Sequence, residues 1–423
     1  ARSGPFPEAA VLRRSHSCSI IIMFMRKNKR YVLVHEIGGI KMSKVALVRC
    51  ESYEYDEVKA AVEKGLALLG GAEKFAGSGE KILLKPNLLS ADPPEKCTTT
   101  HYMVFKAVGE VFKRTGAILS YGDSPGIHTP EAAARKSRIA GAAEELGIPL
   151  ADFHKGDEVS FKEGIQNKRF VIARGVLESD GIISLPKLKT HGFARMTGCV
   201  KNQFGCIPGT LKGEFHVRVP DVLSFSRMLV DLNNLLKPRL FIMDGIVAME
   251  GNGPRGGTPK KMNMLLFSAD PVALDATVCR IINLNPEYVP TVKFGKEAGL
   301  GTYIEEEIEL VGGSIEDFYD PSFSVKREPV KPYKPGGVVQ ILRNSLVPKP
   351  HIDAAKCVKC GVCVNACPVK PKALDWHDGV KTDVPSYIYK RCIRCYCCQE
   401  LCPQSAIELK VPLVRRLFRR GGC

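Results

Sequence analysis

Eight cysteines near the C-terminus repeat one pattern twice. The pattern is C-x-x-C-x-x-C-x-x-x-C-P, and it runs from Cys357 to Pro368 and again from Cys392 to Pro403. Three thiolates that are two residues apart can hold three corners of one cubane cluster. The fourth, set off by three residues and followed by proline, reaches the neighbouring cluster. The spacing therefore predicts two 4Fe-4S clusters.

Each predicted cluster takes three cysteines from one repeat and one from the other. The first set is Cys357, Cys360, Cys363 and Cys402, and the second set is Cys392, Cys395, Cys398 and Cys367. Zinc sites usually use C-x-x-C pairs with a longer spacer, and disulfides belong to oxidising compartments, so neither explains the double repeat. Cys397 breaks the spacing. We interpret it as a packed or spare thiol, and the alternative is that it replaces a neighbouring ligand.

Composition limits the classes of partner and compartment. The chain has 423 residues and a formal net charge of +16. The folded part is less basic than this value, because the clusters with their thiolates are negatively charged and because several basic residues precede Met42. No recognition-helix pattern or set of interleaved aromatic residues accompanies the charge, so we expect no nucleic-acid partner. Sixteen cysteines without a signal peptide indicate a reducing compartment, and we expect a cytoplasmic protein.

Residues 1–41 differ from the rest of the chain. They lack an initiating Met, are rich in Arg, and contain one apolar run from Cys18 to Met25. This run is too short to cross a bilayer and lacks a cleavage site of small residues. We interpret residues 1–41 as a non-native leader or a disordered extension, and we expect the native protein to start at Met42.

From Met42 onwards, short apolar strands alternate with amphipathic helices. Strands are expected at Lys44–Cys50, Lys81–Leu84 and Ala117–Tyr121, with one helix after Asp56 and another from Thr129 to Gly147. Strands that alternate with helices of this length predict an α/β fold, with a mostly parallel sheet and helices on both faces. We assign residues 42–313 to this domain.

Three further segments follow the α/β domain. Residues 314–350 are rich in proline and are expected to form a semi-extended connector, whose cleavage should release a folded α/β domain. Residues 351–410 hold the cysteine repeats and are expected to form a small α+β domain. Residues 411–423 form a basic amphipathic tail that could dock on the protein itself, on an acidic redox partner protein or peripherally on an anionic membrane.

Polar residues follow several predicted strands of the α/β domain. The carboxyl ends of parallel strands meet at one edge of a sheet, where such sheets bind ligands. The residues expected to bind a small anionic molecule are Lys85, Asn87, Asp123, Ser124, Lys187 and Lys189, and those expected to act in catalysis are His128, His191, Lys201 and His216. For Lys201 and His216, a salt bridge or a helix cap is the structural alternative. The G-x-G-x-x-G match at Gly251–Gly256 is rejected as a dinucleotide site, because a strand and not a helix follows it.

Separate motifs in the large domain resemble the domain of unknown function 362 family. They are Lys85 to Leu88, Thr99 to His101, Gly122 to Gly126, Leu185 to Gly209 and Asp270 to Asp275. With the C-terminal bacterial-type ferredoxin domain, this resemblance covers residues 42–410 and implies an iron-sulfur protein without an assigned reaction. The order of His128, His191, Lys201 and His216 is similar to nickel-pincer lactate racemases. The double glycine of those enzymes is absent between Gly198 and Lys201.

These observations favour an iron-sulfur oxidoreductase whose two clusters exchange electrons with an anion bound by the α/β domain. The alternatives are a non-enzymatic electron carrier or assembly factor, and a racemase-like isomerase with accessory clusters. The first interpretation predicts that Lys85, Asn87, Asp123, His128, His191 and Lys201 line one pocket, and that the clusters approach the same edge of the sheet.

Overall fold

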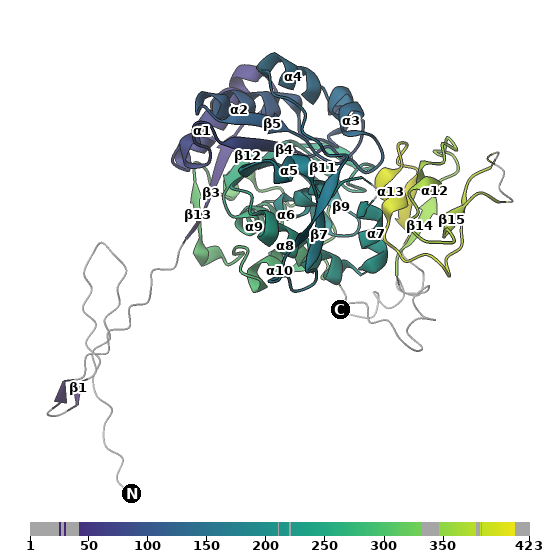
Figure 1. The fold of residues 1–423 in the computed structure, drawn as a ribbon. Helices are drawn as coiled ribbons and strands as arrows, with labels where there is room; N and C mark the ends of the chain where they lie inside the picture. The colour runs from purple at the N-terminus through teal and green to yellow at the C-terminus, as the bar shows by residue number, and fades with distance from the viewer. Residues whose placement is uncertain are drawn as a thin grey trace, which may run out of the picture. The chain divides into compact units, whose positions relative to one another are not determined.

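A nine-stranded sheet forms the centre of the large domain (Figure 1). Its order is β13-β3-β12-β11-β8-β4-β5, and β9 and β10 extend it beside β11. The strands are β3 (Ser43–Arg49), β4 (Lys81–Pro86), β5 (Ile118–Tyr121), β8 (Gly181–Leu185), β9 (Lys187–His191), β10 (Arg195–Thr197), β11 (Leu240–Glu250), β12 (Thr258–Ser268) and β13 (Ile308–Val311). Most pairings are parallel, whereas β12 runs antiparallel to β3 and β11, and β10 antiparallel to β9. The prediction of an α/β fold with a mostly parallel sheet is confirmed.

This computed structural model describes residues 42–209, 211–219, 221–330, 347–377, 381 and 383–410. Of residues 1–41 it describes only the antiparallel pair β1 (Met25–Arg26) and β2 (Lys29–Arg30). The interpretation of residues 1–41 as a leader or extension, and that of 411–423 as a tail, otherwise lie outside the described residues. Residues from Ser43 onwards form one structural unit.

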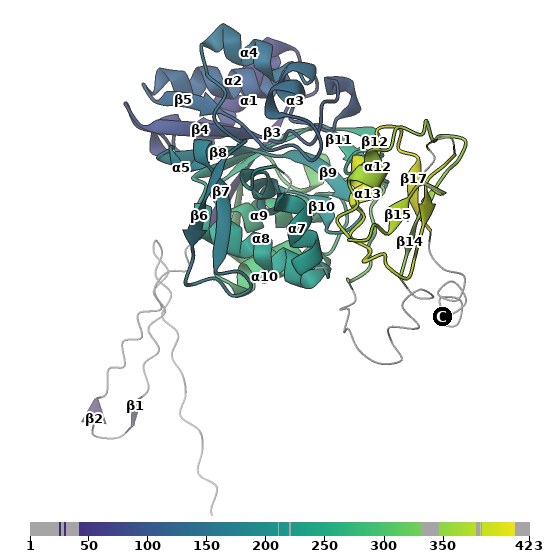
Figure 2. The ribbon, with the colours of Figure 1, turned by 45° about the vertical axis from the view of Figure 1, so that its right-hand side comes forward.

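Helices cover both faces of the sheet (Figure 2). One face carries α1 (Tyr55–Leu68), α2 (Tyr102–Arg114), α3 (Pro130–Lys136) and α4 (Ile139–Leu146), and the other carries α6 (Cys199–Asn202), α8 (Val222–Leu236), α9 (Pro271–Ile281) and α10 (Pro290–Glu297). Successive side chains of a strand point to opposite faces. Val45 and Leu47 therefore join the core under α8 and α9, and Ala46 and Val48 join the core under α1 and α2.

Two predicted elements differ in the structure. The helix expected from Thr129 to Gly147 begins as predicted, with the Thr129 hydroxyl accepting from the Ala132 N–H, but it divides into α3 and α4 at Arg138. Arg138 has φ 65°, a left-handed conformation that interrupts a right-handed helix. Residues 187–191 were expected in a loop and instead form β9. Lys187 and Lys189 are buried in β9 and bind polar partners there. Their charge made this segment look unlike a buried strand in the sequence.

The connector prediction is wrong at both of its ends. Phe323 is fully buried, and the Arg327 guanidinium donates to the carbonyls of Ile282, Asn283 and Phe323, so the segment from Ser314 to Arg327 belongs to the α/β domain. Lys349–Ile352 forms β14 of the small domain. The middle of the predicted connector, residues 331–346, lies outside the described residues.

The small C-terminal domain has the expected α+β architecture. Strand β14 pairs antiparallel with β17 (Ile407–Lys410), and β15 (Leu374–Asp375) pairs with β16 (Ser386–Tyr387). Two short helices, α12 (Val362–Asn365) and α13 (Cys397–Leu401), pack together beside these strands. Both helices begin inside a cysteine repeat.

The two domains share a polar and an apolar contact surface. Residues 251–257 join β11 to β12 as a hairpin tip, and its Arg255 forms a bidentate salt bridge with Asp92 while donating to the Leu401 carbonyl. The Gln399 amide donates to the Asn252 carbonyl and side chain. Tyr396 packs into the core of the α/β domain. The small domain is therefore held against the β9 and β11 side of the sheet (Figure 2).

No helix of the described residues is both long enough and apolar enough to cross a membrane.

Candidate functional site

The eight repeat cysteines surround two separate small cavities. Cys357, Cys360, Cys363 and Cys402 line the first, and Cys367, Cys392, Cys395 and Cys398 line the second. These groups, named here the outer and the inner quartet, have the membership that the spacing predicts. The fold produces them because α12 and α13 lie side by side, which brings the last cysteine of each repeat to the other repeat.

The surroundings of the sulfur atoms fit two 4Fe-4S clusters. The N–H of Ala373 donates to Cys367 Sγ at 3.4 Å, the N–H of Ala406 donates to Cys402 Sγ at 3.3 Å, and the Tyr387 hydroxyl donates to Cys398 Sγ at 3.3 Å. Hydrogen bonds of this kind stabilise ligating thiolates and set cluster potentials. The quartets are not single-ion sites. In the part of the chain that the structure describes, no three Cys, His, Asp or Glu side chains could hold one metal ion.

The quartets differ in their access to solvent. Cys360 of the outer quartet is exposed, and the neighbouring Val358 is 59% exposed. Cys395 and Cys398 of the inner quartet are buried. The outer quartet therefore has one solvent-exposed cysteine, whereas no cysteine of the inner quartet is exposed.

A third cavity, of about 870 Å³, lies between the two domains. Asn87, Asp123, Ser124, Lys189, Lys201, Lys212 and His216 line it from the α/β domain. Cys367, Pro368, Cys397, Glu400 and Leu401 line it from the small domain. Cys367 also belongs to the inner quartet, so one cysteine borders both the cluster site and the cavity.

The strand-end residues form a hydrogen-bonded network beneath the cavity. The Lys85 ammonium donates to Asp123 Oδ1 at 2.8 Å, and Asp123 Oδ2 accepts from the Leu88 N–H at 2.6 Å. The Lys212 ammonium donates to the hydroxyl and carbonyl of Ser124. Lys85 is fully buried and lies behind Asp123, so it neutralises that carboxylate and does not line the cavity.

Apart from the exposed Lys370, three lysines line the cavity, and they are named here the lysine floor: Lys189, Lys201 and Lys212. No salt bridge joins these three to a carboxylate of the described residues. The Lys189 ammonium donates to Asn87 Oδ1 and the Thr98 carbonyl, both at 2.6 Å. Burial, with Lys201 and Lys187 nearby, lowers the pKa of Lys189 to about 7. Burial likewise lowers the pKa of Lys212 to about 7 despite the nearby Asp123.

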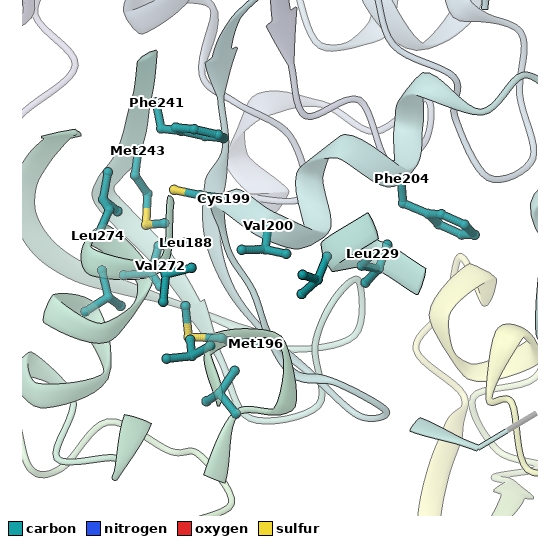
Figure 3. Packing of buried hydrophobic residues seen from close by; sticks show 14 of the residues in the cluster. Leu188, Met196, Cys199, Val200, Phe204, Leu229, Phe241, Met243, Val272 and Leu274 are labelled. Carbon is teal, nitrogen blue, oxygen red and sulfur yellow. The ribbon is translucent and has the colours of Figure 1, made fainter. Parts of the chain in front are cut away.

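Lys201 belongs to the short helix α6, whose Cys199 and Val200 pack in the core (Figure 3). Its neighbours Cys199 and Val200 are fully buried, and the Asp275 carboxylate accepts from both of their backbone N–H groups. Within the described residues, no hydrogen bond or salt bridge reaches the Lys201 ammonium. Burial lowers its pKa, and the nearby Glu400 opposes that shift.

Two histidines lie beside the lysine floor. His191 is buried. Its Nδ1 accepts from the Phe193 and Ala194 N–H groups, and its Nε2 lies 2.8 Å from Glu400 Oε1. His216 lines the cavity and stacks on Phe225, with ring centroids 4.8 Å apart. Burial lowers the pKa of His216 to about 4, so its imidazole is neutral near pH 7. Its Nδ1 has no hydrogen-bond partner among the described residues.

Of the six residues predicted to line one pocket, Asn87, Asp123 and Lys201 line this cavity, whereas Lys85, His128 and His191 do not. Of the other candidate site residues, Ser124, Lys189 and His216 line it, and Lys187 does not. Lys187 is held away by Asp244 at 2.8 Å and by the Tyr53 hydroxyl at 2.7 Å. His128 is exposed, and its Nδ1 accepts from the Ala91 N–H. His191 reaches the cavity only through Glu400.

The lining residues that were not predicted as site residues include Lys212, Glu400 and Cys397. Lys212 lies on α7 (Leu211–Arg218), close after Pro208-Gly209, which is the signal that could have identified it. Glu400 lies inside the second cysteine repeat, where nothing in the sequence indicates contact with a lysine. Cys397 was interpreted as a packed or spare thiol. It borders the lysine floor and is absent from the lining of the inner quartet.

Comparison with known proteins assigns both domains. The family model described as Domain of unknown function (DUF362) matches residues 82–280, and that of the 4Fe-4S dicluster domain matches residues 344–406. The thylakoid-associated protein sll1697 of Synechocystis sp. is 35% identical over 257 residues, which span 60% of this chain and 79% of that protein. An uncharacterized ferredoxin of Methanocaldococcus jannaschii is 35% identical over 60 residues, 14% of this chain and 75% of that protein.

Similarity to solved structures is slight. The lactate racemase apoprotein from Thermoanaerobacterium thermosaccharolyticum has a TM-score of 0.35 and 12% identity, and the match covers 57% of each chain. We draw no conclusion about the reaction from this similarity. The cysteine repeats and the dicluster match identify two 4Fe-4S clusters and an iron-sulfur electron-transfer protein.

Proposed function

Because this chain belongs to the DUF362 family and carries a 4Fe-4S dicluster domain, we propose that it is an oxidoreductase acting on a small anionic molecule in the interdomain cavity. The clusters supply single electrons when they are bound. One observation carries the proposal: Cys367 borders both the inner quartet and the cavity, so a molecule on the lysine floor lies next to a cluster ligand.

The arrangement of the quartets supports a direction for electron transfer. The outer quartet presents Cys360 to solvent, where a redox partner protein can approach. Of the two quartets, the inner one contributes a cysteine to the cavity lining, Cys367, and the outer one contributes none. Electrons from a partner would therefore pass from the outer to the inner quartet and then to the bound molecule.

The cavity residues divide into binding and proton-moving groups. Lys189, Lys201 and Lys212 hold the anion, because their ammonium groups have no bonded carboxylate. His216 is placed to accept or return a proton, because its imidazole is neutral near pH 7 and its Nδ1 has no partner among the described residues. His191 acts as a positioning residue that holds Glu400 beside the floor.

Anaerobic purification followed by mass spectrometry of the released small molecules tests the proposal first. The molecule that is found should then reoxidise the reduced clusters in a stopped-flow experiment. Lys201→Met should slow this step about tenfold or more, because a charge-assisted contact is lost. Lys293→Met, on the exposed surface of α10, is the control with the same change of charge. A cavity without a bound molecule, in a protein whose clusters still exchange electrons with partner proteins, would favour the carrier alternative.

Peripheral membrane contact is a separate part of the proposal. A relative is named thylakoid-associated, and residues 411–423 of this chain combine four arginines with Leu413, Val414, Leu417 and Phe418. Such a segment suits an anionic bilayer surface. The full chain should sediment with vesicles that contain anionic lipid and should be released by salt, whereas a chain ending at Lys410 should stay in solution. Equal sedimentation of the two chains would contradict this part.

A further inference from the structure

We propose that the cavity is built for a ligand with two negative charges, and that the protein takes up protons when this ligand binds. The inference rests on the proposed function for the place of the ligand and adds its charge class. It depends on how the charged groups around the cavity are paired.

Most charges at the cavity are already compensated. Asp123 is neutralised by Lys85 at 2.8 Å, and Glu214 is paired with Arg218 at 3.1 Å near the rim. Lys370 lines the rim and is exposed to water. These paired or solvated groups contribute little to the charge that a bound ligand has to balance.

The lysine floor is not compensated. Lys189 and Lys212 donate only to neutral oxygens, and Lys201 has no hydrogen bond or salt bridge within the described residues. Glu400 is the carboxylate that lines the same part of the cavity, opposite the floor. At pH 6, where Lys189 and Lys212 are protonated, three ammonium groups against one carboxylate leave two positive charges on these side chains. A dianion would balance them, whereas a monoanion would leave one charge in a poorly hydrated site.

The close spacing of the lysines also couples ligand binding to proton uptake. Lys189 faces Lys201 and Lys187 as well as the more distant Asp123 and Asp92, and Lys212 faces Lys85, Lys201, Cys206 and Asp123. The pKa of Lys189 and that of Lys212 lie near 7 because burial and like charges disfavour the ammonium form. A bound dianion favours the ammonium form and raises both pKa values. Binding should therefore take up close to no protons at pH 6 and one to about two protons at pH 8.

The neighbouring histidines, His216 and His191, are not the groups to which we assign the proton uptake. His216 has a pKa of about 4, so its imidazole is neutral over this range. Burial lowers the pKa of His191, and the nearby Glu400 opposes that shift. The uptake of protons is assigned to Lys189 and Lys212 because the geometry gives them no carboxylate partner.

Calorimetry with succinate and butyrate tests the inference, since the two probes have similar length and carry two and one carboxylates. Holo-protein with oxidised clusters is titrated at pH 6 and pH 8, in buffers of different ionisation enthalpy that report proton uptake. Succinate should bind about tenfold or more tightly than butyrate at pH 6, and its affinity should fall between pH 6 and pH 8. Neither probe needs electron transfer, so the result is independent of whether the clusters reduce a substrate.

Two variants at one position separate charge from structure. Lys201→Met should reduce the preference for succinate to about threefold or less, whereas Lys201→Arg should keep it. Lys293→Met, at an exposed position of α10, should bind both probes as the parent protein does. Equal affinities for the two probes, including the absence of binding for both, would overturn the charge assignment. A preference for succinate without proton uptake at pH 8 would overturn the linkage.

Discussion

Removing Arg255 should destabilise the protein more than removing any exposed ion pair does. The Arg255 guanidinium meets Asp92 through two hydrogen bonds of 2.8 Å, and both side chains are 4% exposed. Arg255→Met leaves the Asp92 carboxylate buried without its cation. Breaking a buried pair in this way costs about 3–5 kcal/mol. The loss of the bond to the Leu401 carbonyl adds to the effect.

The pH dependence of this effect has a defined sign. Burial raises the pKa of Asp92, but the hydrogen bonds from Arg255 and Ser90 outweigh it and hold that pKa below its ordinary value. A carboxyl group with a lowered pKa stabilises the fold above its unfolded pKa of about 3.9, and this contribution is lost as the pH falls through the lower folded value. The difference between parent and Arg255→Met should therefore be largest near pH 7 and shrink in acid.

Anaerobic urea unfolding, followed by cluster absorbance and far-UV circular dichroism, measures the cost. Arg174→Met is the control, because the Arg174 pair with Asp157 is 45% and 56% exposed and an ion pair in water contributes little to stability. The double variant Arg255→Met with Asp92→Asn should recover part of the loss, because no buried charge remains. A cost for Arg255→Met as small as that of the control would refute the role given to this salt bridge.

Three further predictions concern the clusters, the domain contact and the cavity. Anaerobic protein should hold about eight iron and eight sulfide per chain, and electron paramagnetic resonance should show that Cys360→Ser loses the outer cluster and Cys392→Ser the inner one. A specific protease site inserted within residues 331–346 should give two fragments that co-elute in gel filtration, since both contribute to one core; separate elution would contradict the shared core. Gly205→Ala should cost about 1–3 kcal/mol in urea unfolding, because its Cβ would lie 1.7 Å from Asp123 Oδ1, whereas Gly141→Ala meets open space and should stabilise the protein slightly.

The sequence predicts best what depends on short-range spacing. The quartets could be assigned because both repeats keep their ligands within twelve residues, and each local turn brings three thiolates together. Asn87 and Asp123 could be assigned because parallel strand ends share an edge. The same reasoning predicted that Lys187 binds the anion. The structure shows that the Lys187 ammonium is instead paired with Asp244, which lies on another strand.

Residues brought together by domain docking could not be predicted. Glu400 and Cys397 belong to the second cysteine repeat, and their approach to Lys201 depends on contacts made by Arg255 and Gln399. The connector was misjudged for a related reason. Its prolines suggested an extended chain. Phe323 is nevertheless buried in the core, and no pattern in the neighbouring sequence predicts that burial.

The division of the cavity between two domains affects how its selectivity can change during evolution. One wall is encoded near Lys189 to Lys212 and the other near Cys397 to Leu401, about two hundred residues further along the chain. Substitutions in the short helix α13 can reshape the cavity while the lysines stay unchanged. Relatives with the same lysines could then accept different molecules, and a dicluster domain transplanted from another protein would carry its own selectivity with it.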